Sequence, residues 1–459
     1  MLKNCQPPKA GIISHLNPSM TVPKTKKQEQ RPIAIDLFAG AGGLSLGLEE
    51  AGFDVAAAVE IDPIHAAVHE FNFPYSRTIC ASVVDLTGED IRNKSGIGNR
   101  DIAIVAGGAP CQGFSLIGKR ALDDPRNNLV FHFVRLVSEL NPQYFIFENV
   151  KGLTLGAHRK FLFEIIEELK SCGYDVVEDF RVLNAADYGV PQDRRRLFLM
   201  GARKGLTLPD YPEASGRTTV NEAISDIPDA DRYRKLITSD SVKAKFKKGS
   251  LYSQRLRLQV KDPTNFGYVR AFDSDLLTSS TRTEHTDLSR KRFAETQPGK
   301  TEPVSRFRKP PLDGLCNTLR AGTDSARGAF TSPRPIHPVY PRVITVREAA
   351  RLHSYPDWFR FHATKWHGFR QIGNSVPPLL GRAVAGQIAK AMKYRPKKPK
   401  TVLQLGNEGL LTMVMASAAS YFGVSHKVIG QRSRQSLSPN KTAKAEKNKG
   451  AVNVKNSKT

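Results

Sequence analysis

The sequence predicts a doubly wound α/β fold, in which helices cover both faces of a buried, largely parallel sheet. Within residues 32–203, short apolar runs rich in β-forming residues alternate with stretches of helical periodicity. This alternation is typical of βαβ units. In residues 204–341 the periodicity weakens, and Arg, Lys, Ser, Thr and Asp accumulate. That stretch predicts a second, smaller and irregular domain.

Each apolar run within residues 32–203 is assigned to a strand, and each helical pattern between two runs to a helix. The expected strands are 33–37, 55–59, 102–105, 144–147, 176–182 and 197–200. The expected helices are 43–51, 63–71, 129–140 and 160–172. Order returns at 346–352, 371–376 and 379–391, and the last of these has the length and composition of a helix that packs back on the sheet.

The two ends of the chain are strongly basic. The 459 residues carry a formal net charge of +25, and residues 1–31 and 391–459 hold net charges of +5 and +12 of it. Both ends are poor in aromatic residues, so they bury too little apolar surface to offset the entropy of ordering. We therefore expect largely disordered basic tails at 1–31 and 395–459, except that the apolar stretch within 403–429 can form a helix on the body.

Composition also narrows the class of protein. An excess of basic residues and a pI of about 9.9 favour a polyanionic partner. Five cysteines without a Cys-x-x-Cys pair argue against a disulfide framework or a zinc ribbon. The longest apolar stretch, 410–424, is shorter than the roughly 18 residues that a membrane span needs. We expect a soluble cytoplasmic protein with no membrane partner.

The first candidate site is the glycine-rich segment 36–45, which follows a strand and opens a helix. Ser45 stands where the third glycine of a Gly-x-Gly-x-x-Gly pattern would be, so pyrophosphate binding is not favoured. Glu60 ends the next strand and can accept both hydroxyls of a ribose, and Asp85 can accept from an adenine amine. The pattern predicts a nucleoside site; the alternative is that the glycines serve only a tight turn.

The second candidate is Cys111, in the segment Gly-Gly-Ala-Pro-Cys-Gln-Gly at 107–113. A single cysteine is usually a small buried hydrophobic residue. This one lies in a glycine-flanked loop after an apolar strand, where ligands of α/β proteins bind. A nucleophilic thiol is the better interpretation.

Three further segments carry polar groups toward the same edge. Glu148 closes the strand at 144–147, although alone it could be a capping or ion-paired acid. Arg194 and Arg196 are two residues apart at the start of the strand at 197–200, so they can share a face; the alternative is a solvated basic edge. Asn374 and Ser375 lie in a polar turn before the last helix, which could be only a loop.

Taken in chain order, these segments resemble the motifs of the DNA cytosine-C5 methyltransferase family. Members have a glycine-rich S-adenosylmethionine loop, Pro-Cys-Gln, Glu-Asn-Val, Gln-x-Arg-x-Arg, a variable recognition region and a late Gln-x-Gly-Asn-Ser-Val-Pro-Pro. The motifs occur here in that order over about residues 32–391, and 347–358 is similar to the segment preceding the last motif. Departures are small: Asp193 stands where Asn is frequent, and His353 where Gln is frequent.

The resemblance implies a domain plan and a reaction. Residues 32–203 would be a Rossmann-like, S-adenosylmethionine-dependent catalytic domain, 204–341 a target-recognition domain, and 342–394 a segment returning to the catalytic domain. The target cytosine would be flipped out of the duplex. The Cys111 thiolate would add to its C6, Glu148 would share a proton with N3, Arg196 would contact O2, and Arg194 would support the site.

The same resemblance implies S-adenosylmethionine as the consumed methyl donor and no metal. The implied cofactor contacts are Phe38, Gly40, Gly42, Glu60, Ile61, Asp85, Asn374 and Ser375. The implied partner is double-stranded DNA, which a bacterial, monomeric enzyme would methylate at a specific sequence, with a restriction endonuclease as a possible companion.

Three other functions remain open at this stage. Some relatives of the family methylate a cytosine in transfer RNA, and a basic body suits either nucleic acid. A Rossmann-like dehydrogenase would fit the glycine loop and Glu60, but it leaves Cys111 and the arginine pair unexplained. A catalytically silent DNA-binding relative is disfavoured by the presence of both Cys111 and Glu148.

Overall fold

The computed structural model describes residues 30–110, 128–156, 158–322 and 334–429. The chain divides into two units, Met1–Arg31 and Pro32–Thr459, and the description below concerns the second. Cys111 lies outside the described residues.

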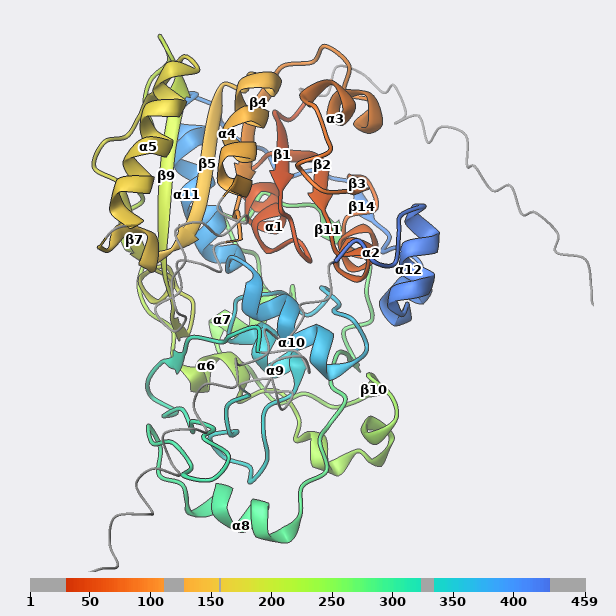
Figure 1. The fold of residues 1–459 in the computed structure, drawn as a ribbon. Coiled ribbons are helices and arrows are strands. Elements are labelled where there is room, and N and C mark those ends of the chain that lie inside the picture. Colours follow the sequence, from red (N-terminus) through yellow and green to blue (C-terminus); the bar gives the residue numbers. More distant parts are fainter. Residues whose placement is uncertain (1–29, 111–127, 157, 323–333, 430–459) are drawn as a thin grey trace, which may run out of the picture. The chain divides into compact units, whose positions relative to one another are not determined.

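A mixed sheet forms the centre of this unit (Figure 1). Its strands lie in the order β3-β2-β1-β4-β5-β9-β6, and β7 pairs with β9. The bounds are β1 (Ile33–Leu37), β2 (Asp54–Glu60), β3 (Arg77–Cys80), β4 (Ile102–Gly107), β5 (Tyr144–Val150), β6 (Tyr174–Val176), β7 (Arg181–Asn184) and β9 (Arg195–Arg203). The first five are parallel to one another, and β9 runs antiparallel to β5, β6 and β7. The predicted α/β class is confirmed.

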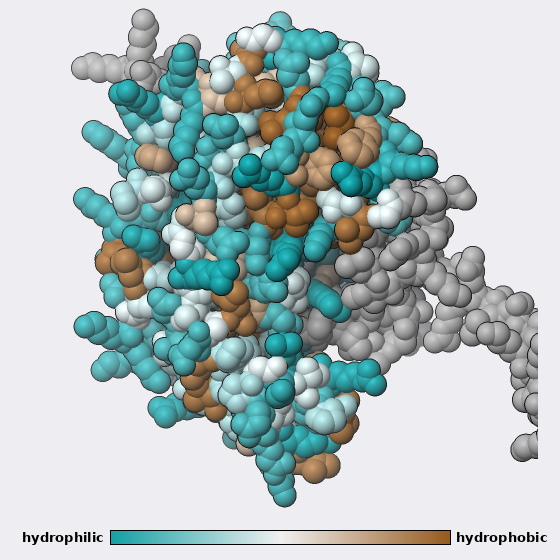
Figure 2. Space-filling view, turned by 90° about the vertical axis from the view of Figure 1, so that its left-hand side faces the viewer, coloured by the Kyte–Doolittle hydropathy of each residue, from teal (hydrophilic) through white to brown (hydrophobic). Residues whose placement is uncertain are grey.

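Helices cover both faces of the sheet. One hydrophobic core lies beneath α3 (Gly88–Ser95), α4 (Asn128–Leu140) and α5 (His158–Ser171). The opposite core lies beneath α1 (Gly43–Glu50) and α11 (Pro378–Ala391), while α2 (Pro63–Asn72) packs at the β3 edge. The α5 side of the molecule is mainly hydrophilic, and its hydrophobic residues gather in small groups (Figure 2). Because amphipathic helices cover both faces of the sheet, the fold is doubly wound.

The rest of the unit consists of short elements around a separate core. They are α6 (Val220–Ile224), α7 (Leu251–Leu256), α8 (Asp287–Glu295), α9 (Val346–Arg351), α10 (Lys365–Asn374), β8 (Gln192–Asp193), β10 (Val242–Lys243), β11 (Val269–Arg270), β12 (Leu276–Leu277), β13 (Cys316–Asn317), β14 (Val402–Leu403) and α12 (Met415–Phe422). This core joins apolar side chains from 220–236 with aromatic side chains from 355–369. Residues 342–372 therefore help to build the irregular region, and α11 returns to the sheet.

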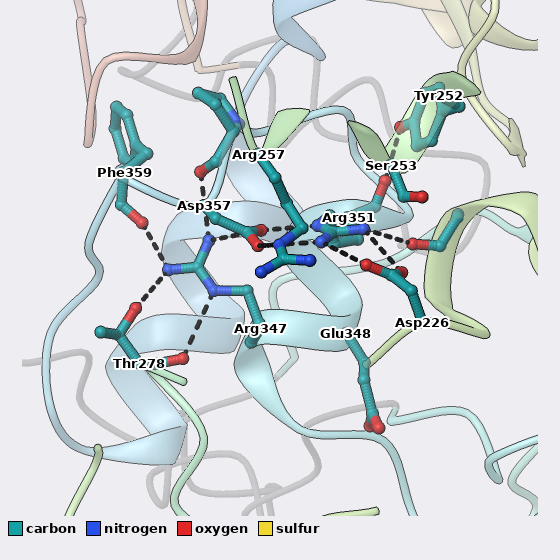
Figure 3. Close-up of polar contacts among 12 residues, drawn as sticks. Asp226, Tyr252, Ser253, Arg257, Thr278, Arg347, Glu348, Arg351, Asp357 and Phe359 are labelled. Carbon is teal, nitrogen blue, oxygen red and sulfur yellow. Dashed lines mark hydrogen bonds and ion pairs between the residues drawn. The ribbon is translucent and has the colours of Figure 1, made fainter. Parts of the chain in front are cut away.

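Buried arginines hold this irregular region together (Figure 3). Arg351 donates to both carboxylate oxygens of Asp226 and of Asp357, at distances from 2.5 to 3.2 Å. Arg347 donates to the hydroxyl of Thr278 at 2.7 Å. These guanidinium groups are buried, and side chains within the protein accept their hydrogen bonds. The region therefore presents fewer positive charges to a partner than its number of basic residues suggests.

A buried ion pair ties this region to the sheet helices. Arg270 of β11 donates to Oε1 of Glu49 at 2.8 Å and to Oε2 at 2.7 Å, and both side chains are fully buried. The Tyr75 hydroxyl donates to the same carboxylate at 2.6 Å, and the guanidinium stacks over Trp358. Such a pair strongly favours one arrangement of its two elements, since separating them would strand a buried charge.

Several elements differ from those expected. The predicted strand 176–182 is wrong: the chain leaves the sheet after β6 and returns as β7, because both short strands pair with different ends of β9. Residues 371–374 form the last turn of α10 rather than the start of a new ordered segment. The short β3 and the polar α3 were not expected.

The chain after α11 is ordered further than the expected boundary at 395. β14 pairs with β11, and Leu410 and Leu411 are buried against α2. Among the described residues, no helix is long and apolar enough to cross a bilayer.

Candidate active site at the carboxyl edge of the sheet

The polar segments predicted from the sequence follow neighbouring parallel strands. The glycine-rich segment follows β1, Glu60 ends β2, Gly108 follows β4, and Glu148 lies near the end of β5. The strand order changes direction between β1 and β4. In open α/β sheets, ligands bind at the carboxyl edge beside such a switch point.

The turn after β1 needs its glycines. Phe38 has φ +61° and Gly42 has φ +102°, both in the region that side chains with a Cβ rarely adopt. A Cβ on Gly42 would lie 2.3 Å from a ring carbon of Phe73, so no larger residue fits. At Gly40, with φ +58°, the same construction meets nothing within 4 Å. Gly40 therefore borders open space where a ligand can approach the backbone.

Glu60 is held beside this turn. Its Oε2 accepts from the backbone N–H of Gly40 at 2.7 Å, and its Oε1 accepts from that of Asp62 at 2.8 Å. Burial raises the pKa of Glu60, and the charge of His65 partly offsets that rise. The next residue, Ile61, leaves 38% of its surface exposed. A carboxylate oxygen can accept more than one hydrogen bond, so Glu60 retains capacity for a diol.

A buried polar chain lies beneath the glycine turn. Ser45 donates to Oδ2 of Asp36 at 2.6 Å and lies 3.0 Å from Nε2 of His69, whose Nδ1 is 3.0 Å from the Thr78 hydroxyl. Burial raises the pKa of Asp36 to about 7 and lowers that of His69 to about 3. His69 stacks on Phe73, the ring that excludes a side chain at Gly42. The chain joins β1, α1, α2 and β3 beneath the glycine turn.

Ser375, another expected cofactor residue, lies beside the start of α1. A Cβ on Gly43 would meet the carbonyl oxygen of Val376 at 2.4 Å and the Ser375 Cβ at 2.9 Å. The turn before α11 is thus packed against the glycine segment. Asn374 is exposed at the end of α10. Asp85 is also exposed, in the turn that follows β3.

Glu148 and Arg196 form an ion pair near the ends of β5 and β9. Arg196 Nε lies 3.0 Å from Glu148 Oε1, and the side chains are 15% and 11% exposed. Burial raises the pKa of Glu148, while the charges of Arg196 and Arg194 partly offset that rise. Gly108 makes room for the carboxylate, because a Cβ there would lie 2.7 Å from Glu148 Oε2. Burial thus favours the protonated form of this carboxyl group, and the neighbouring arginines favour its charged form.

The neighbouring Asn149 holds the backbone that leads toward Cys111. Its Nδ2 donates to the carbonyl of Ala109 at 3.3 Å, and its Oδ1 accepts from the N–H of Val150 at 2.8 Å. Asn149 is 2% exposed. Although Cys111 lies outside the described residues, the chain two residues before it is anchored beside Glu148.

Arg194 has a different environment from Arg196. Its side chain is 1% exposed, and it donates to the carbonyls of Leu319, Gly373 and Ser375 at 2.8 to 2.9 Å. Burial lowers its pKa, and the charge of Arg196 lowers it further. Its hydrogen bonds thus brace the turn before α11. The exposed Arg195 lies between the buried Arg194 and the partly buried Arg196.

Gln192 and His353 complete the support behind Arg194. Gln192 donates to Nδ1 of His353 at 2.9 Å and accepts from the N–H of Leu319 at 3.0 Å. His353 Nε2 lies 3.1 Å from the carbonyl of Ser375. This arrangement requires a neutral imidazole with its proton on Nε2, and burial lowers the pKa of His353 well below its usual value.

Known proteins similar to this chain identify the family. The model of the family described as C-5 cytosine-specific DNA methylase matches residues 33–390. The chain belongs to that family. The methyltransferase M.XorII of Xanthomonas oryzae, described as type II, is 69% identical over 404 residues, which cover 88% of this chain and 95% of that protein.

Two more distant relatives agree with the family assignment. The type II methyltransferase M.DdeI of Desulfomicrobium norvegicum is 34% identical, over 77% of this chain and 88% of its own. A crystal structure provisionally described as a DNA modification methyltransferase encoded within an E. coli prophage is 35% identical. It covers 79% of this chain and 99% of its own, with a TM-score of 0.66. Membership of the C-5 cytosine-specific DNA methylase family makes the protein an enzyme that acts on DNA.

Some residues of the site were not found from the sequence. Gly108 and Asn149 position groups in it, and the chain of Asp36, Ser45 and His69 supports the glycine turn. Asn149 lies within the Glu-Asn-Val motif and Asp36 within the glycine segment. No local sequence pattern, however, predicts that their partners lie 9 to 40 residues away.

Proposed function

We propose that this methylase transfers a methyl group from S-adenosylmethionine to C5 of a cytosine in a specific double-stranded DNA sequence. The reaction would use a flipped base and a transient bond between Cys111 and C6. The observation that carries this proposal is the Glu148–Arg196 pair, buried at the sheet edge that also carries Glu60 and the open backbone at Gly40.

The residues present fit the methyl donor. Its adenosine ribose would be held by Glu60, and the open side of Gly40 leaves space for its backbone approach. The half-exposed Ile61 and the exposed Asp85 suit an adenine, the first by contact with its face and the second by accepting from its amine. The full proposed set is Phe38, Gly40, Gly42, Glu60, Ile61, Asp85, Asn374 and Ser375. When bound, the donor supplies an electrophilic sulfonium methyl group.

Cytosine C5 is a weak nucleophile until a group adds at C6. In the proposal the Cys111 thiolate forms a bond to C6 while N3 takes a proton from Glu148. The resulting enamine attacks the methyl carbon through C5, which leaves the donor as its neutral thioether. Water then accepts the C5 proton, the S–C6 bond breaks to release the thiolate, and N3 returns its proton to Glu148 as 5-methylcytosine is released.

Glu148 and Arg196 would stabilise the addition step. Negative charge develops over N3 and O2 of the ring, so a proton donor at N3 and a guanidinium at O2 favour the adduct over the free base. Burial raises the pKa of Glu148 and so favours the protonated form that the addition step needs. Arg194 would act indirectly, by positioning the turn that faces the donor.

Residues 204–341 would read the DNA sequence. We base this on their place between the two parts of the sheet domain and on their basic side chains. The proposal includes a monomeric enzyme in the bacterial cytoplasm, where a restriction endonuclease could act beside it.

Labelled S-adenosylmethionine tests the reaction directly. The enzyme is incubated with unmethylated genomic DNA or with total RNA, and 5-methylcytosine is mapped by conversion sequencing. We expect label in DNA at constant flanking bases; label in RNA alone would overturn the DNA assignment.

A second experiment tests the covalent step. Cys111→Ala should abolish methyl transfer while binding of the donor, measured by calorimetry, survives. With a 5-fluorocytosine at the mapped target, the unaltered enzyme should become irreversibly linked to DNA through residue 111. Methyl transfer by the alanine variant would exclude the proposed adduct.

A further inference from the structure

A row of lysines follows one short extended segment of the irregular region. Val242, Ala244 and Phe246 pack against the core shared by 220–236 and 355–369. The residues between and after them, Lys243, Lys245, Lys247 and Lys248, are exposed. Side chains of an extended chain alternate between its faces, so apolar residues anchor one face while the other presents the lysines.

The backbone of this segment is held in place. β10 pairs with β12, with Lys243 opposite Leu276. Beyond β10, the backbone N–H of Ala244 donates to the backbone carbonyl of Asp275 at 2.9 Å. The backbone N–H of Lys247 donates to the backbone carbonyl of Asp226, also at 2.9 Å. The lysines are therefore mounted on a fixed support rather than on a free loop.

The charge of the row is available. None of the four lysines forms an ion pair within the part of the chain that the structure describes. Two buried arginines of the region differ from these lysines, since Arg347 donates to a carbonyl and a hydroxyl and Arg351 to two carboxylates (Figure 3). The exposed cationic charge of this segment is thus carried by lysine.

A hollow of about 430 Å³ adjoins the row. Lys245, Lys247 and Lys248 line it, together with the amides of Gln254 and Gln259. Arg257 lies at its wall over the ring of Phe246 at 3.9 Å. The remaining polar side chain is the carboxylate of Asp275. Several cations and hydrogen-bond donors facing one acid favour an anionic occupant.

We propose that Lys243, Lys245 and Lys247 bind phosphates of one DNA strand, with Lys248 beside them at the hollow. This rests on the proposed DNA substrate and assigns it a specific surface. Lysines two residues apart in an extended chain are about 6.6 Å apart, so the row spans about 13 Å. One strand of B-DNA places a phosphate every 3.4 Å or so along the axis, about four over that span. Such contacts bind any sequence and do not read bases.

The test is the triple variant Lys243→Gln/Lys245→Gln/Lys247→Gln. Binding of a short labelled DNA duplex is measured by fluorescence anisotropy over a series of salt concentrations. The plot of log K against log salt has a negative slope, and each lost phosphate contact makes it less steep by about 0.9. The slope of the triple variant should therefore be less steep by about 2.7. Between about 50 and 200 mM salt, the unaltered enzyme should then lose about 40-fold more affinity than the variant.

A matched variant controls for net charge. The variant Lys94→Gln/Lys204→Gln/Lys390→Gln also removes three positive charges from exposed positions. Lys94 and Lys390 lie in the last turns of α3 and α11, and Lys204 follows β9. It should keep the slope of the unaltered enzyme. In the triple variant of the row, donor affinity and the methylated sequence should stay unchanged, while KM for DNA rises.

The outcomes separate this inference from the proposed function. An unchanged slope in the row variant, or an equal fall in both variants, would overturn the lysine assignment while methylation of DNA still stands. Failure of the unaltered enzyme to bind or methylate DNA would overturn the proposed function itself.

Discussion

Adding one methyl group at Gly108 should displace the proposed catalytic carboxyl of Glu148 without unfolding the protein. A Cβ at this position would lie 2.7 Å from Glu148 Oε2, whereas ordinary contact begins at 3.4 Å. The carboxylate must therefore retreat by about 0.7 Å. Its other oxygen is 3.0 Å from Arg196 Nε, so the ion pair has to rearrange as the carboxylate moves.

The expected loss follows from that displacement. A misplacement of about 1 Å of a catalytic group can cost about 100-fold in rate, so Gly108→Ala should lower kcat by about 10- to 100-fold. That loss corresponds to about 1.4 to 2.7 kcal/mol of transition-state stabilisation. Gly108 is not among the described residues with positive φ, so alanine introduces no backbone strain there.

The assay compares kcat on DNA with the midpoint of thermal unfolding. Gly108→Ala should change the first strongly and the second little. Gly386→Ala is the matched control, since a Cβ there meets nothing within 4 Å, and it should leave kcat unaltered. A Gly108→Ala enzyme with kcat within twofold of the original would refute the argument that the carboxylate position is critical.

Two other perturbations test the electrostatics of the structure. Because burial raises the pKa of Glu148 and the protonated form donates to N3, kcat should fall as pH rises through that pKa; Glu148→Gln should lose this alkaline limb and about 100-fold in rate. A pH profile of kcat with the same alkaline limb in the Gln variant would assign the limb to another group. Arg270→Met should lower the free energy of unfolding by about 3 to 5 kcal/mol, because the buried Glu49 carboxylate loses its cationic partner. Urea denaturation measures this loss, and adding Glu49→Gln should recover part of it; a single variant of unaltered stability would show that the pair contributes nothing.

The central sheet could be predicted because its strands are marked in the local sequence. Continuous apolar runs at 33–37 and 144–147 lie within β1 and β5. The four-residue β3 was missed because it begins with Arg77 and Thr78, which interrupt an apolar run. The break between β6 and β7 was missed because it depends on where each strand meets β9, a contact between distant residues.

The site was predictable to a similar depth. Strand order brings Glu60 and Glu148 to one edge, as their positions at strand ends indicated. The environment of Arg194 could not be foreseen, since its partners are carbonyls 125 to 181 residues away. Every residue has a backbone carbonyl group, so no pattern of side chains predicts which carbonyls accept from Arg194.

The three carbonyls that accept from Arg194 also determine when this part of the protein can fold. A nascent chain that ends before residue 373 already contains the glycine turn and Glu148, yet it lacks two of the acceptors through which Arg194 braces the turn before α11. These contacts can form only when nearly the whole body has left the ribosome. A prematurely terminated polypeptide would therefore leave the Arg194 guanidinium without two of its three carbonyl acceptors.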